Sequence, residues 1–99
     1  MKKIKEYVEH IKDELESAQD YAEKYVENKV KGEIQTANQY KDMAQDELKH
    51  AMYIHEWAVK EIQQLSKVYT PPVDMQEKWD REHREYVENV ALIKQILSM

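Results

Sequence analysis

The sequence predicts an all-α protein of three helices, and three observations carry this prediction. The 99 residues include a single Gly and two Pro, so positions that break helices are rare. Ala, Leu, Glu, Lys, Gln and Met, which all favour helix, are frequent. Apolar residues recur at alternating spacings of three and four along most of the chain. Gly32 and the segment 70–72 divide it into three stretches, which predicts one domain over residues 1–99 with helices at about 3–30, 34–68 and 73–97.

The first predicted helix has one apolar face and one charged face. The apolar positions are Ile4, Val8, Ile11, Leu15, Ala18, Ala22 and Tyr25. Most carboxylates fall on the opposite face, where water solvates them. Glu14 is the exception, because at 100° per residue it lies within about 60° of Ile11 and Ala18. A carboxylate inside an apolar arc needs a counter-charge, a metal or a proton, so Glu14 is a candidate functional residue.

The second predicted helix has two apolar faces. One consists of Ala44, Leu48, Ala51, His55, Ala58, Ile62 and Leu65, and the other of Tyr40, Met43, Glu47, His50, Ile54, Trp57 and Glu61. A helix with two such faces packs against at least two neighbours. Glu47 and His50 belong to the second face, three residues apart and therefore one turn apart. Thr36 and Gln39 are spaced as a capping box, which places the start of this helix within 33–37.

The third predicted helix has one apolar face, formed by Trp79, His83, Tyr86, Val90, Ile93 and Leu97. His55 and His83 lie on apolar faces, and we interpret both as hydrogen-bonded core histidines. A separate metal site built from Glu61, Asp80 and His83 near the 70–72 turn is the alternative interpretation.

Charge and composition exclude several functions. The net charge of -5 argues against binding nucleic acid, whose phosphates attract a basic surface. No apolar run approaches the ~20 residues of a membrane span. The start MKKIKEYVEH lacks the apolar stretch of a signal peptide, and a cytoplasmic location is expected. Because the chain has no Cys, any metal site must use carboxylate and imidazole.

Two short motifs together resemble the ferritin-like di-iron carboxylate family, especially bacterioferritins and rubrerythrins. Members of that family carry a helix with Glu and an aromatic residue seven positions later, followed by a helix with Glu-x-x-His-Ala. Here ELESAQDY runs from Glu14 to Tyr21, and DELKHA contains Glu47 and His50. Glu14 and Glu47 are 33 residues apart, which is the family's own spacing.

The specificity of the resemblance comes from the two motifs together. Glu-x-x-His alone is a weak signal in a chain that contains so many Glu residues, whereas the two motifs jointly are far more specific. The resemblance covers residues ~10–60 and implies an antiparallel hairpin over ~3–68.

The resemblance assigns roles to matching positions. Glu14 is expected to be a terminal metal ligand, Glu47 a bridging carboxylate and His50 a nitrogen ligand. Tyr21 is expected beside the site as the candidate catalytic residue. Iron is the expected metal and manganese an alternative, because hard oxygen ligands with a single imidazole suit these two ions, and zinc is a possible adventitious occupant.

The sequence departs from the family in having one such hairpin rather than two. Typical members place a Glu on each of two helices and Glu-x-x-His on each of two others, all in one four-helix bundle. The resemblance therefore implies a homodimer that completes the bundle and binds two irons, a half-bundle plan similar to that of encapsulated ferritins. No segment is recognisable as a tail that targets an encapsulin shell, so such a shell remains an unsupported partner.

Two functions stay open at this point. One is a ferroxidase-type oxidoreductase or iron-handling protein that reacts Fe(II) with dioxygen or peroxide. The other is a non-catalytic helical interaction module, in which Glu14, Glu47 and His50 form a buried polar cluster without metal.

Overall fold

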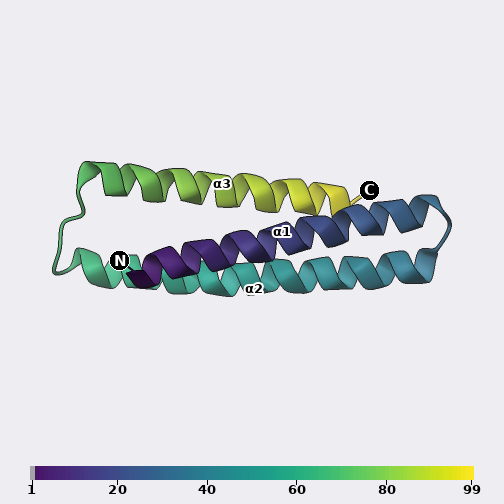
Figure 1. The fold of residues 1–99 in the computed structure, drawn as a ribbon, viewed down its shortest axis with the longest axis horizontal. Coiled ribbons are helices and arrows are strands. Elements are labelled where there is room, and N and C mark those ends of the chain that lie inside the picture. The colour runs from purple at the N-terminus through teal and green to yellow at the C-terminus, as the bar shows by residue number, and fades with distance from the viewer. Residues whose placement is uncertain (1) are drawn as a thin grey trace.

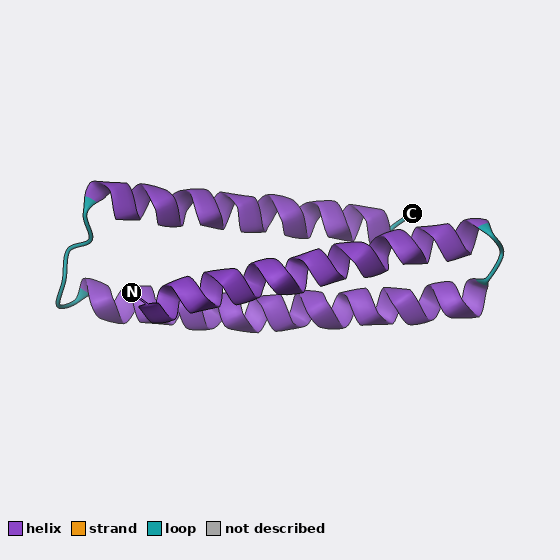
Figure 2. Cartoon of the chain, in the orientation of Figure 1, coloured by secondary structure: helices purple, strands orange, loops and turns teal. Residues whose placement is uncertain are grey.

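The computed structural model describes residues 2–99, which form three α-helices (Figures 1 and 2). Helix α1 spans Lys2–Val30, α2 spans Ile34–Ser66 and α3 spans Val73–Leu97. The all-α prediction is confirmed, and α2 ends two residues earlier than expected. None of the three helices carries an apolar stretch long enough to cross a membrane.

A tight turn at Gly32 joins α1 and α2 into an antiparallel hairpin. Gly32 has a φ of 80°, a left-handed conformation that a residue with a Cβ adopts at a cost. Its N–H donates to the carbonyl of Lys29 at 3.1 Å, and the N–H of Glu33 donates to the carbonyl of Asn28 at 2.9 Å. These bonds satisfy carbonyls that the end of α1 would otherwise leave unpaired.

Helix α2 begins at Ile34, with Glu33 as its N-cap residue and no side-chain capping bond. The predicted capping box is wrong, because Thr36 lies inside the helix rather than at its cap. The start itself falls within the predicted range.

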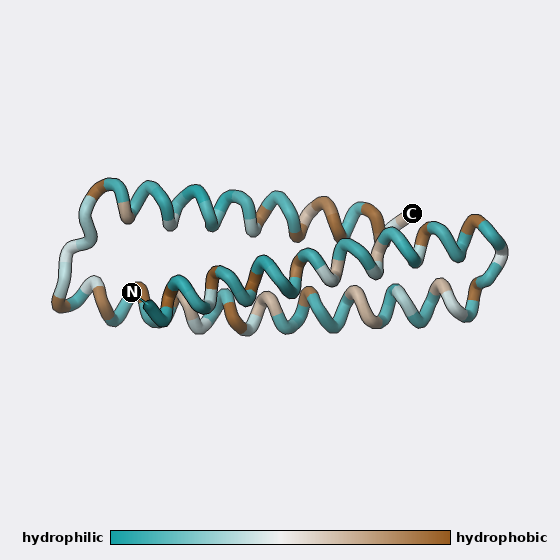
Figure 3. Tube along the Cα trace, viewed as in Figure 1, coloured by the Kyte–Doolittle hydropathy of each residue, from teal (hydrophilic) through white to brown (hydrophobic). Residues whose placement is uncertain are grey.

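The hairpin core forms where the apolar face of α1 meets a row of small residues on α2. The buried residues are Ile4, Ile11, Leu15, Ala18, Ala22 and Tyr25 on α1 and Ala37, Ala44, Ala51, Ile54 and Ala58 on α2. Figure 3 shows hydrophobic positions recurring at helical spacing between hydrophilic ones. The alanines let the two helices approach closely, so side chains near this contact are brought within reach of one another.

Helix α3 lies along α1 and has few contacts with α2 (Figure 1). Only Ile93 and Leu97 of α3 are buried, both near its end. Across the helix pair, the Nζ of Lys12 lies 3.0 Å from Glu82 Oε2. The first half of α3 is thus attached mainly by its surface side chains.

This arrangement corrects the prediction for one histidine. His83 is exposed rather than buried in the core, because the first half of α3 does not pack closely on α2. His55 is partly buried, and its Nε2 lies 3.1 Å from Nδ1 of His83.

Candidate metal centre

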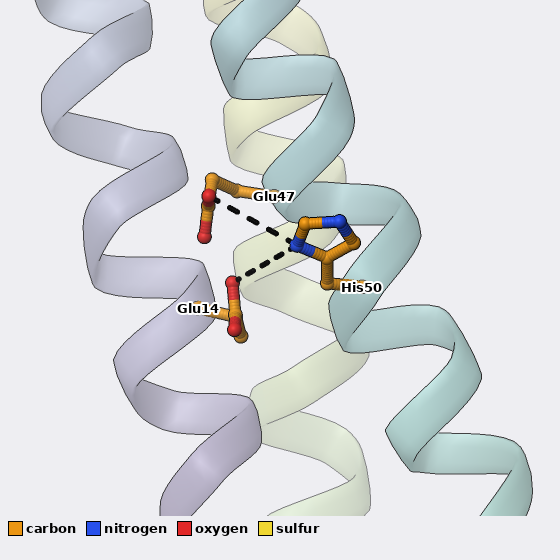
Figure 4. A group of neighbouring side chains, drawn as sticks. All are labelled: Glu14, Glu47 and His50. Carbon is orange, nitrogen blue, oxygen red and sulfur yellow. Dashed lines mark ion pairs between the residues drawn. The ribbon is translucent and has the colours of Figure 1, made fainter.

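Glu14, Glu47 and His50 converge on the face of the hairpin that points away from α3 (Figure 4). Each offers one ligand atom, and these atoms all lie within 4.8 Å of one another. His50 Nδ1 is 3.6 Å from Glu14 Oε2 and 4.0 Å from Glu47 Oε1. Both distances exceed that of a hydrogen bond, so the three groups surround a small space without closing it.

The position of the three side chains follows from the hairpin. Glu14 lies eighteen residues before Gly32 and Glu47 lies fifteen after it, so antiparallel helices bring them to nearly the same height. His50 follows one turn later on the same face of α2. Ala18 and Ala51 are fully buried at the helix contact, and their small side chains keep the two helices close at this level.

The two carboxyl groups perturb each other. The carboxyl of Glu47 lowers the pKa of Glu14 by hydrogen bonding to its ionised form, against the smaller effect of burial. The same interaction, together with burial and the charge of Glu14, raises the pKa of Glu47 to about 7. Near neutral pH the pair therefore tends to hold one proton between two carboxyl groups. Glu14 Oε2 is buried and has no hydrogen-bond partner in residues 2–99.

His10 belongs to the site although the sequence analysis did not single it out. Its Nε2 lies 3.1 Å from Glu14 Oε1, one turn away on α1. Such a contact fixes the orientation of a carboxylate whose other oxygen is the candidate ligand atom. The only signal in the sequence was the four-residue spacing between His10 and Glu14, which many pairs in this charged helix share.

Tyr21 does not belong to the group of converging ligand atoms. It lies two turns beyond Glu14, or about 10 Å along α1. Its ring packs against Tyr40 of α2, with ring centroids 6.2 Å apart. Its predicted catalytic role remains a prediction.

The alternative site of Glu61, Asp80 and His83 does not form. Glu61 pairs with Lys3 at 3.1 Å, and Asp80 accepts a hydrogen bond from Gln76. His83 faces His55. Within residues 2–99, the only group of three or more potential ligands close enough to share an ion is Glu14, Glu47 and His50.

The candidate centre opens onto a partly apolar surface. The side chain of His50 is 53% exposed, against 17% for Glu14 and 24% for Glu47. On the same face of α2, Met43 and Trp57 are exposed, and the Trp57 ring lies 6.1 Å from that of Tyr7 on α1. We call the surface formed by Tyr7, Met43, His50 and Trp57 the open face.

No family model matches the sequence, and neither a curated protein nor a solved structure matches it.

Proposed function

We propose that this chain binds iron through Glu14, Glu47 and His50 and handles or oxidises it as a dimer of ferritin-like half-bundles. The observation that carries the proposal is the convergence of two carboxylates and one imidazole, from two helices, within 4.8 Å. Carboxylate with one imidazole is a donor set suited to iron or manganese, and zinc is an alternative occupant.

The electrostatics of the site support a cation there. Near neutral pH the two carboxyl groups hold one proton between them, and a cation can take the place of that proton. A divalent ion bound there would give Glu14 Oε2 the partner that it lacks. His10 holds the other oxygen of Glu14, so the carboxylate is already oriented toward the ion.

Dimerisation completes the proposed site. Three ligands from one chain leave coordination positions open, and His50 is exposed on the open face. A second copy placed face to face brings its own Glu14, Glu47 and His50 to the first set, which matches the ligand count of a complete di-iron bundle. Glu47 would be the carboxylate placed to hold two ions close. Bound Fe(II) would supply the electrons that reduce dioxygen or peroxide, and the carboxylates would stabilise the ferric product.

Melting curves with chelator and with Fe(II) under anaerobic conditions test this function. Metal that binds only the folded protein stabilises it by about 2.7 kcal/mol at a hundredfold excess over the dissociation constant. Glu47→Ala is expected to abolish the metal-dependent rise in Tm and to cost the metal-free protein little, because a like charge leaves the cluster. Glu16→Ala, at an exposed position on α1, serves as the matched control. An unchanged wild-type midpoint on adding metal would exclude the metal site.

Admitting air to the Fe(II)-loaded protein then tests oxidation. Absorbance of ferric iron is expected to develop faster with wild type than with Glu47→Ala or with buffer alone. Equal rates in all three samples would restrict the proposal to iron binding.

The exposed Met43 and Trp57 favour a second candidate, a helical interaction module that needs no metal. In that case metal leaves the midpoint unchanged. The midpoint of Glu47→Ala is then equally unaffected by metal. The same melting curves distinguish the two functions.

A further inference from the structure

A pocket between α3 and the hairpin shares no lining residue with the candidate metal centre. Its volume is about 110 Å³. One water needs roughly 10–15 Å³ on this scale, and an apolar cavity of about 150 Å³ holds benzene. The space therefore suits one six-membered ring. Its apolar lining includes Ile4, Val8, Leu15, Ala58, Ile62 and Trp79.

The polar lining of the pocket consists of His55, His83, Lys12, Glu82, Glu85, Asn89 and the hydroxyl-bearing Tyr86, and the two histidines face each other. Their facing nitrogens are 3.1 Å apart, so one ring donates its N–H to the other. Two neutral imidazoles have two N–H donors and two acceptor nitrogens, and one of each is used in this bond. Whichever tautomers are present, the pair keeps one free donor and one free acceptor. Tyr86 stacks on His55 at 4.2 Å with an interplanar angle of 8°, which fixes the ring at the pocket.

The charges at the pocket disfavour an anionic ligand. Lys12 and Glu82 neutralise each other across a distance of 3.0 Å. Glu85 then leaves the lining with a negative charge, which repels anions. Burial, and to a smaller extent the nearby His83, lower the pKa of His55, which favours the neutral form of its ring.

We propose that this pocket binds a small neutral molecule made of one apolar ring and one hydroxyl group, of the size of phenol. The ring lies against the apolar lining, and the hydroxyl forms a hydrogen bond with a free ring nitrogen of the His55–His83 pair. An apolar pocket with a few convergent polar groups is the usual form of a small-molecule site. This binding is separate from the iron chemistry and needs no metal.

Amide chemical shifts of the ¹⁵N-labelled protein, recorded in chelator, test the pocket with phenol, toluene and benzoate. Phenol and toluene are expected to shift amides around His55, Ala58 and Trp79 in a saturable way, while benzoate shifts them less. Shifts that do not saturate, or that centre on the open face, would overturn the proposal. The absence of metal makes the result independent of the iron proposal.

Variants test the hydroxyl contact. His83→Leu is expected to lower the ratio of phenol affinity to toluene affinity by about fivefold, the value of one hydrogen bond. His83→Gln retains both donor and acceptor and is expected to restore the ratio. Tyr53→Leu, an exposed position on α2 outside the pocket lining, should leave it unchanged. If His83→Leu does not fold, His55→Leu is used in its place. A ratio unaffected by the folded variant contradicts the assignment of the histidine pair.

Discussion

Glu14 and Glu47 have opposite pKa shifts because one proton serves both carboxyl groups. The pKa of Glu47 is raised to about 7, whereas that of Glu14 is lowered. A group with a raised pKa binds its proton more tightly in the folded state. Its contribution to stability is therefore full below its ordinary pKa, near 4.3, and is lost as pH rises toward 7. Glu14 has the reverse dependence, and its contribution is lost as pH falls below its ordinary pKa.

The metal-free protein should accordingly lose stability between about pH 4.5 and 7 through Glu47. Glu47→Gln removes the titrating group while keeping a polar side chain, so the fall attributable to Glu47 should disappear. Urea unfolding in chelator across this pH range measures the effect. Glu16→Gln, which lies away from the pair, should follow the wild type. A parallel pH dependence in wild type and Glu47→Gln would show that the two carboxyl groups do not share a proton.

His10 acts on the site through Glu14, so its removal should weaken metal binding without abolishing it. His10→Ala is expected to lower Fe(II) affinity by about tenfold, the smaller end of the range for residues that orient a ligand, because His10 is itself exposed. Anaerobic competition with a chromogenic chelator measures this affinity. His10→Gln should recover part of it by hydrogen bonding to Glu14. Identical affinities for His10→Ala and wild type would make the contact incidental.

At the residue scale the sequence predicted which three side chains converge better than it predicted their surroundings. Glu14 was identifiable because it interrupts an apolar face, and Glu47 and His50 because they lie on one. His10 was missed, since a histidine four residues from a carboxylate is common on a charged helix. His83 was wrongly expected in the core, because helical periodicity gives the direction of a side chain and not the distance to the next helix.

Among the three elements, α3 is the least firmly attached. Its buried side chains, Ile93 and Leu97, both lie near its end, and its earlier apolar residues are only partly covered. The sequence pattern gave the three helices to within about two residues, since Gly32 and the prolines at 71 and 72 mark their limits. It did not show that the apolar face of α3 is covered at one end and open at the other.

Ile93→Ala should therefore release α3 while leaving the hairpin intact. Ile93 is 1% exposed, and truncating a buried Ile to Ala typically costs about 2–5 kcal/mol. Hydrogen exchange is expected to accelerate along α3 and to change little in α1 and α2. Val87→Ala, at an exposed site on the same helix, should have almost no effect. Equal acceleration in all three helices would mean that the chain unfolds as a single unit.

The whole molecule exposes more surface than a compact monomer of its size. Its extents are 55 × 18 × 16 Å, and its accessible surface is 6891 Å². A compact monomer of this mass is expected to expose about 5,900 Å². The excess, on the order of 1,000 Å², resembles the area that one partner buries in a stable interface. The open face, with its exposed Met43 and Trp57, is where the proposed second copy would complete the proposed metal centre.

If that assembly exists, metal binding and dimerisation strengthen each other, because binding free energies are reciprocal. Sedimentation in chelator and with anaerobic Fe(II) should show a dimer that metal tightens. Trp57→Glu places a charge on the open face, two turns from His50, where burying it without a partner is costly. This variant is expected to weaken the dimer by at least about tenfold and to weaken iron binding in parallel.

Val87→Glu is the control, because it adds the same charge to an exposed apolar position on α3 and should alter neither dimerisation nor iron binding. A wild type that remains monomeric at micromolar concentration with metal supplied would contradict the two-chain site. A dimer lost in Val87→Glu but kept in Trp57→Glu would place the interface on α3 instead.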